Sequence, residues 1–239
     1  MWNPVIDADN IVHLTCEILS EQYAPVLERK TQLVNEEMLG DVANIPLPEI
    51  IEEKKNIEDS LTKIDYSAIA IIQTKVRETI KELNAEKFIL ICNGSNKYRK
   101  NINPLYKANR VNTLPPGLKE RIKNLLVQRY KAFDIQGRLP ENTLETDDYV
   151  MLVYNYYSLL ESNVILASPD KDFHQTIGNL YKTATQNRSS KILKIDESTY
   201  TIRACVTNED KDRDGEINLM TSWNKRIGNY MQHPILLSS

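Results

Sequence analysis

The sequence predicts an α/β fold in which a mostly parallel central sheet carries helices on both faces. Two observations support this class. Short apolar runs bounded by turn residues recur along the chain, and such runs are typical of buried strands. Between them lie segments with apolar residues at helical spacing. Strands that alternate with helices in this way form parallel sheets, because each return to the same sheet direction needs a crossover connection.

The composition limits the kind of protein. The 239 residues are 41% hydrophobic and 26% charged, which is typical of a globular chain with a sizeable core. A net charge of −3 excludes a surface that is basic all over, so any nucleic-acid contact must come from a local patch. Three scattered cysteines predict neither a disulfide framework nor a zinc cluster. We expect a cytoplasmic protein without membrane contact, because residues 1–10 lack a secretory signal and no apolar run spans a bilayer.

The N-terminal part of the chain predicts a strand, a helix and a charged insertion. A short apolar strand at 4–7 ends on Asp7, and apolar residues at helical spacing begin near Asn10. Residues 28–60 are rich in charge and contain two prolines, so we expect an insertion that is partly helical and partly loop. An amphipathic helix follows at 66–84.

The rest of the chain alternates strands with helices. The predicted strands are the apolar runs at 87–92, 163–168, 191–195 and 200–206. The predicted helices lie at 118–133, 146–160 and 172–182. These elements place residues 1–206 in one domain, which is followed by a C-terminal tail at 207–239.

Acidic residues follow two of the predicted strands and open one predicted helix. Seven side chains share this placement: Asp7, Asp9, Glu145, Asp147, Asp148, Asp170 and Asp172. Because ligands of parallel sheets lie beyond the carboxyl ends of the strands, we expect these acids to converge at one edge. Crowded carboxylates repel one another unless a cation neutralises them, and they suit Mg²⁺ or Mn²⁺. Each cluster alone is also explained as a solvated turn or a helix N-terminus, but the combination predicts a metal site.

A basic stretch lies between the strand at 87–92 and the helix at 118–133. It alternates cations with tyrosines, namely Lys97, Tyr98, Arg99, Lys100, Tyr106, Lys107 and Arg110. Arg and Lys neutralise phosphates, and tyrosine rings stack on bases. The next helix adds further cations, for which a solvated helix face is the alternative: Lys119, Arg121, Lys123, Arg129 and Lys131. A basic stretch beside an acidic metal site predicts an enzyme that hydrolyses phosphodiesters.

Four motifs together resemble the family of phage 5′-to-3′ exonucleases and flap endonucleases, which includes the 5′-nuclease domain of bacterial DNA polymerase I. They are IDADN at 6–10, YRKNINPLYKANR at 98–110, ETDDYV at 145–150 and ASPDKDF at 167–173. The resemblance covers about residues 3–182. It implies a PIN-like 5′-nuclease fold and a nuclease that uses one or two Mg²⁺ or Mn²⁺ ions to cut DNA. It also suggests a phage origin, and then a location in the host cytoplasm.

The resemblance further implies roles for individual residues. It matches metal ligands to Asp7, Glu145, Asp148, Asp170 and Asp172. It matches Asp147 to a residue that supports these ligands without binding the metal directly. It matches the grip on the scissile phosphate and the single-stranded arm to Arg99, Lys107 and Arg110. Residues 111–140 match the region that arches over the active site.

The chain departs from the family pattern in two places. Asn93 or Gly94 follows the strand at 87–92, where the family usually has a metal-ligating aspartate. After residue 182 neither the later Gly-Asp-x-x-Asp segment nor the helix–three-turn–helix element that contains it is recognisable. An acidic turn at 208–221 matches the start of a calcium loop, but Thr221 stands where Glu is required. A solvated turn, or substitute ligands for a second metal, are the alternatives for this segment.

Two other functions stay open. A degenerate family member would bind nucleic acid or a protein partner without cutting, and Asn93 favours this hypothesis. A small RNA-cleaving nuclease of the PIN type would share the acids, but it would not account for the basic stretch at 97–110.

Overall fold

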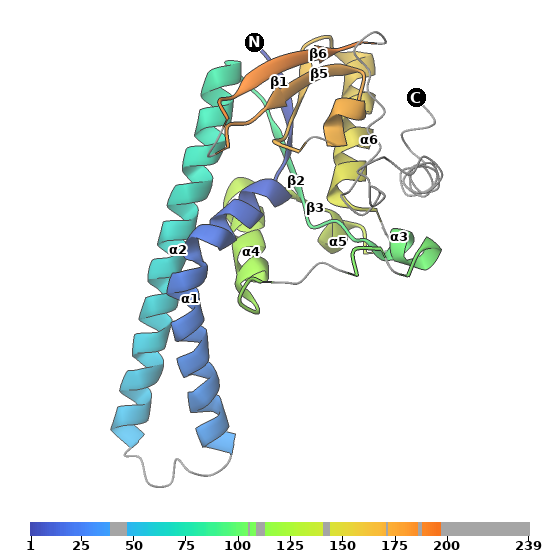
Figure 1. Ribbon diagram of the computed structural model, residues 1–239. Helices are drawn as coiled ribbons and strands as arrows, with labels where there is room; N and C mark the ends of the chain where they lie inside the picture. Colours follow the sequence, from blue (N-terminus) through green and yellow to red (C-terminus); the bar gives the residue numbers. More distant parts are fainter. Residues whose placement is uncertain are drawn as a thin grey trace, which may run out of the picture.

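A six-stranded sheet forms the centre of the protein, which we describe from a computed structural model (Figure 1). In spatial order its strands are β3 (Phe133–Asp134), β2 (Ile89–Cys92), β1 (Asn3–Asp7), β4 (Val164–Ala167), β5 (Gly178–Lys182) and β6 (Lys191–Ile195). Val5 is aligned with Ile89 on one side and with Leu166 on the other. Every strand pair is parallel except β5 with β6. The predicted mostly parallel sheet is therefore confirmed.

The structure describes residues 1–38, 47–104, 106–108, 113–140, 144–170, 172–185 and 188–196. The predicted strand at 200–206, the acidic turn at 208–221 and Arg110 lie outside these ranges. Between Lys182 and Asp196 the described residues form β6 and one isolated bridge, and they include no pair of helices. No helix in the described ranges combines the length and apolar character needed to cross a bilayer.

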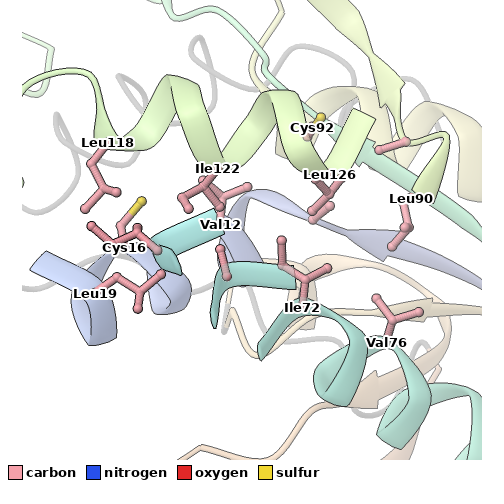
Figure 2. Close-up of a cluster of buried hydrophobic side chains, with 14 of the residues drawn as sticks. Val12, Cys16, Leu19, Ile72, Val76, Leu90, Cys92, Leu118, Ile122 and Leu126 are labelled. Carbon is pink, nitrogen blue, oxygen red and sulfur yellow. The ribbon is translucent and has the colours of Figure 1, made fainter. Parts of the chain in front are cut away.

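Helices cover both faces of the sheet, as predicted. One face carries α1 (Asp9–Met38), α2 (Leu47–Leu83) and α4 (Leu118–Tyr130). Figure 2 shows Val12, Ile72 and Ile122 from these three helices, which meet in one apolar cluster with Leu90 of β2. The other face carries α6 (Thr146–Leu160). Because both faces are buried, the middle of each inner strand is apolar without polar alternation.

The charged insertion at 28–60 is helical on both sides of residues 39–46. Residues 28–38 continue α1, and residues 47–60 begin α2. The two helices lie side by side and extend away from the sheet as a helical hairpin (Figure 1). Leu33, Ile57 and Leu61 are buried in the core cluster, while the charged side chains of the hairpin face water. Pro48 stands in the first turn of α2, where a helix tolerates proline.

The predicted helix at 172–182 is wrong. Residues Asp172–Gln175 form a short 3-10 helix, and β5 follows at Gly178. Gly178 has a φ of +134°, which glycine adopts without strain. β5 pairs with β4 on one side and with β6 on the other, and this pairing outweighs the helical pattern of the segment.

Candidate active site

The candidate site lies at the carboxyl end of the parallel strands. The residues that end or follow these strands are Asp7, Asn93, Asp134 and Ser168. α6 begins against the same edge, and the backbone N–H of Gly94 donates to Thr146 Oγ1 at 2.8 Å. A Cβ at Gly94 would lie 2.0 Å from the Thr146 backbone nitrogen. Glycine therefore permits the close approach that brings the acids of α6 to the strand ends.

Asp7, Asp147 and Asp170 form what we call the carboxylate centre. The pKa of Asp7 is well above its ordinary value, because the residue is buried and because Asp147 and Asp9 repel its charge. Burial, followed by the charges of Asp170 and Glu145, raises the pKa of Asp147 to about 7. These carboxylates therefore act on one another across the gap between β1, α6 and the segment after β4.

Hydrogen bonds hold Asp7 at the end of β1 and Asp9 at the start of α1. Asp7 accepts from the Asp9 backbone N–H at 3.1 Å, from Ser168 Oγ at 3.1 Å and from the Asn10 amide. Asp9 accepts from the Asn93 backbone N–H at 3.0 Å and from Thr146 Oγ1 at 2.7 Å. Asp9 thus joins β1 to β2 and to α6. These bonds explain why Asp9 is needed for the architecture whether or not it meets a metal.

Three polar residues of the site were missed in the sequence. Asn10, Thr146 and Ser168 each donate to an acid of the site. Their position in the sequence could have identified them, because each lies inside one of the acidic motifs. Short polar side chains beside clustered acids are suitable hydrogen-bond donors to them.

Asp170 and Asp172 lie in the turn after β4. The Asp170 backbone N–H donates to Ser168 Oγ at 3.1 Å, and the Asp172 backbone N–H donates to Asp170 Oδ1 at 2.9 Å. These two bonds define a tight turn that places Asp170 within electrostatic reach of Asp147. Asp172 begins the 3-10 helix and is half-buried.

Glu145, Asp148 and Arg99 form what we call the arginine–carboxylate group. The Arg99 guanidinium, whose side chain is 2% exposed, forms ion pairs with both carboxylates. The Asp148 carboxylate also accepts from the Glu145 backbone N–H at 3.2 Å, which is the capping arrangement of a helix start. The structure therefore brings a residue that was expected to grip phosphate onto two residues that were expected to bind metal.

In the rest of the basic stretch, two residues contact Glu145 and two lysines are exposed to solvent. Lys107 Nζ lies 2.6 Å from Glu145 Oε1, and the Tyr106 hydroxyl lies 3.0 Å from Glu145 Oε2. Lys97 and Lys100 of α3 (Lys97–Ile102) are exposed, and Tyr98 is half-buried. Arg110, also expected to grip phosphate, lies outside the described residues.

Of the α4 cations, Arg121 makes a two-pronged ion pair with Asp65 at 2.5 and 2.7 Å. Lys123 points into the site edge, where its Nζ lies 2.7 Å from Asn93 Oδ1. The other cations of α4, Lys119 and Arg129, are exposed, and so is Lys131, which directly follows the helix. The helix that carries them is part of the core rather than a free arch, because Leu118, Ile122 and Leu126 are fully buried.

Asn93, Lys123 and Asp134 form what we call the asparagine network. Asn93 has a left-handed φ of +64°, which asparagine tolerates better than most residues. Its Oδ1 accepts from Lys123 Nζ at 2.7 Å and from Gln136 Nε2 at 3.2 Å. Its Nδ2 donates to Asp134 Oδ1 at 2.7 Å. The polar atoms of the Asn93 side chain are therefore used within the protein.

The donors of the carboxylate centre fit a hard divalent cation. Their oxygens are the ligands that Mg²⁺ and Mn²⁺ prefer, and a bound cation would offset the burial and mutual repulsion that raise the pKa values of Asp7 and Asp147. The Asp147 carboxylate accepts no hydrogen bond from any residue that the structure describes. As they stand, the described residues contain no group of three or more Asp, Glu, His or Cys side chains gathered around one point. Binding an ion would therefore draw these carboxylates together.

One comparison with known proteins gives a match. A family model described as the N-terminal resolvase-like domain of 5′-3′ exonucleases matches residues 52–207, which is more than half of the chain. The matched range begins inside α2 and includes the basic stretch, α6 and the turn after β4. A search of the curated proteins and a search of the solved structures each found no match.

Proposed function

This chain belongs to the family of 5′-3′ exonucleases that share the N-terminal resolvase-like domain, and we propose from this premise that it is a divalent-metal-dependent nuclease that hydrolyses DNA. The family supports a PIN-like nuclease domain and a nucleic-acid substrate. The observation that carries the finer proposal is the carboxylate centre, where the buried Asp7 and the half-buried Asp147 and Asp170 repel one another at the carboxyl edge of the sheet. Crowding of this kind lowers stability unless a cation enters.

In this proposal Asp7, Asp147 and Asp170 hold the metal. When bound, a divalent ion supplies positive charge that activates water and offsets the charge that develops on the phosphate. Ser168 and Asn10 orient Asp7 through their hydrogen bonds, so that its carboxylate is held in one direction. Glu145 and Asp148 position the basic stretch through Arg99, and neither is needed as a ligand in this arrangement.

Lys107 is the residue we assign to the scissile phosphate. Its side chain is 25% exposed, its Nζ lies 5.0 Å from the centre of the Tyr106 ring, and it contacts Glu145 at the rim of the site. A phosphate that entered would offer this ammonium a second anionic partner. Lys97 and Lys100 are exposed on α3 and extend the same basic surface toward a single-stranded arm.

The test is cleavage of 5′-labelled single-stranded, duplex and flap DNA, and of matched RNA, with Mg²⁺ or Mn²⁺. Wild type is compared with Asp147→Asn and Asp170→Asn, and with Asp59→Asn as a control on the exposed hairpin. We expect the two site variants to lose about a hundredfold or more in rate, while the control keeps full activity. A folded wild type that cuts none of these substrates with either metal would contradict the proposal. Preferential cutting of RNA would instead favour an RNA-cleaving nuclease.

A non-cleaving protein that binds nucleic acid is the second candidate. One observation favours it, since Glu145, Asp148 and the Asn93 oxygen are already engaged by protein cations. This candidate predicts that wild type retards DNA in a gel, with or without divalent metal, and never shortens it.

A further inference from the structure

The two ends of the acidic edge differ in how their charge is neutralised. At the β4 end, none of the ion pairs within the described residues involves Asp7, Asp147 or Asp170. At the β2 end, the asparagine network contains the ammonium of Lys123. Among the described residues, a lysine ammonium thus directly contacts the β2 end of the edge, whereas the acids at the β4 end form no ion pair.

The position of Lys123 is determined by the packing of α4. Ile122 and Leu126 are fully buried between α4 and the sheet, and Lys123 directly follows Ile122 in the helix. The residue is 8% exposed, and its Nζ lies 2.7 Å from Asn93 Oδ1 and 2.7 Å from Glu120 Oε1. Burying an ammonium is costly unless polar groups surround it, and here the Glu120 carboxylate of the same helix and the Asn93 oxygen meet this need.

Asn93 connects this ammonium to two acids. Its backbone N–H donates to Asp9 Oδ1 at 3.0 Å, and its Nδ2 donates to Asp134 Oδ1 at 2.7 Å. The oxygen of the same side chain faces Lys123. The oxygen of Asn93, the atom of this side chain that could ligate a cation, is therefore already used by the Lys123 ammonium and the Gln136 amide.

We infer that Lys123 takes the place of a second divalent ion, so that this chain holds a single ion, at the carboxylate centre. A divalent cation beside Asn93 would meet a like charge at hydrogen-bonding range of the same oxygen, which disfavours its binding. The inference rests on the proposed function for the one ion that remains. It assigns to Lys123 a role as a fixed cation that contacts no substrate.

The experiment counts Mn²⁺ ions per full-length chain by titration calorimetry and by the free-ion signal in electron paramagnetic resonance. Four proteins are compared: wild type, Asn93→Asp, the double variant Asn93→Asp/Lys123→Gln, and Lys119→Gln as an exposed control on the same helix. We expect one ion in wild type and in the control. We also expect one ion in Asn93→Asp, because the new carboxylate would pair with the Lys123 ammonium. The double variant should gain a second ion, whose affinity is at least tenfold higher than any second binding in Asn93→Asp.

Two ions or none in wild type would overturn the inference, and so would a second ion in Asn93→Asp or only one in a folded double variant. Circular dichroism establishes whether the double variant folds; if it does not, the counts for wild type and Asn93→Asp decide. The proposed function is judged separately by cleavage. Wild type that cuts DNA with two bound ions would overturn only this inference, whereas wild type with one ion and no cutting would overturn only the proposed function.

Discussion

The guanidinium of Arg99 lies between two carboxylates that are themselves almost fully buried. Glu145 and Asp148 have exposed side-chain fractions of 9% and 7%, against 2% for Arg99. Two acids and one arginine leave a net negative charge, and Lys107 and Tyr106 supply the further hydrogen bonds to Glu145. Such a group holds the basic stretch on the first turn of α6, and its stability depends on every member being present.

We expect Arg99→Ala to lower the free energy of unfolding by about 3–5 kcal/mol, because it removes the buried cation that Glu145 and Asp148 share. Arg29→Ala is the matched control, since Arg29 pairs with Glu53 on the exposed hairpin and should cost about 1 kcal/mol or less. Urea denaturation followed by circular dichroism measures both. Equal losses in the two variants would mean that Arg99 does not hold the group together.

The thiols of Cys16 and Cys92 give a pH dependence. Burial raises the pKa of Cys16 to about 11 and that of Cys92 to about 12, and both residues are fully buried. Unfolded thiols ionise near pH 8.5, so between about pH 9 and 11 the native state binds more protons than the unfolded state. The free energy of unfolding should therefore fall as the pH rises through this range, by up to about 1.4 kcal/mol per pH unit for each thiol.

Urea midpoints at pH 8, 9, 10 and 11 measure this fall. The comparison protein is Cys16→Ala/Cys92→Ala, in which the thiol contribution is gone and the slope should be shallower. A double variant with the same slope as wild type would assign the whole effect to lysines and tyrosines.

At the scale of elements, the contact between β2 and α6 assembles the site. Gly94 is where they touch, and the Cβ of any other residue would meet the Thr146 backbone at 2.0 Å. Both sides of this contact are backbone, so neither can move without displacing β2 or α6. We expect Gly94→Ala to separate the α6 acids from the strand ends, with a loss of about 1–3 kcal/mol or more in stability and a larger fractional loss of cleavage.

Gly117→Asn is the control for that substitution. Gly117 has a left-handed φ of +78°, which asparagine tolerates, and a Cβ there would meet only the Tyr23 hydroxyl at 3.4 Å. Melting temperature and DNA cleavage are measured on both variants. If Gly94→Ala had the melting temperature and the cleavage rate of wild type, the contact between β2 and α6 would be loose enough to accept a methyl group.

The elements also differ in how well the sequence predicted them. β1, β2 and β4 were predicted because both faces of each strand are covered, and this requires continuous apolar runs. β5 has only Leu180 and Tyr181 as buried residues, and its strand character depends on β4 and β6. The hairpin was underestimated as helix because its few buried residues, such as Leu33 and Ile57, are widely spaced among charges.

For the site, the sequence predicted which edge of the sheet carries the acids, but not which individual side chains turn toward it. The rule that parallel strands end at one edge concerns Asp7 and Asp170, and the charge of Asp147, at the start of α6, acts on Asp7, as that of Asp170 acts on Asp147. Nothing in the local sequence distinguishes Arg99 from Lys97 and Lys100, although only Arg99 turns inward. Likewise, Lys123 looks like one of five cations on a helix, and only the packing of α4 selects it for the asparagine network.

At the scale of the whole molecule, charge is distributed unevenly. The net charge is −3, and the described part of the hairpin has more acidic than basic residues. The helix α3, which carries the exposed Lys97 and Lys100, lies instead near the start of α6 (Figure 1). A DNA strand is therefore expected to meet favourable potential over a short length only, with the hairpin outside the contact.

This uneven distribution predicts how DNA binding depends on salt. Each lost phosphate contact changes the slope of log K against log salt by about 0.7 for single-stranded DNA, so Lys97→Gln/Lys100→Gln should make that slope shallower by about 1.4. Lys54→Gln/Lys55→Gln removes the same charge from the hairpin and should leave the slope unchanged. Fluorescence anisotropy with labelled single-stranded DNA, without divalent metal so that no cutting occurs, measures both. If the hairpin variant changed the slope as much as the α3 variant, binding would follow the charge of the whole molecule, and the assignment of the DNA path to the basic stretch would fail.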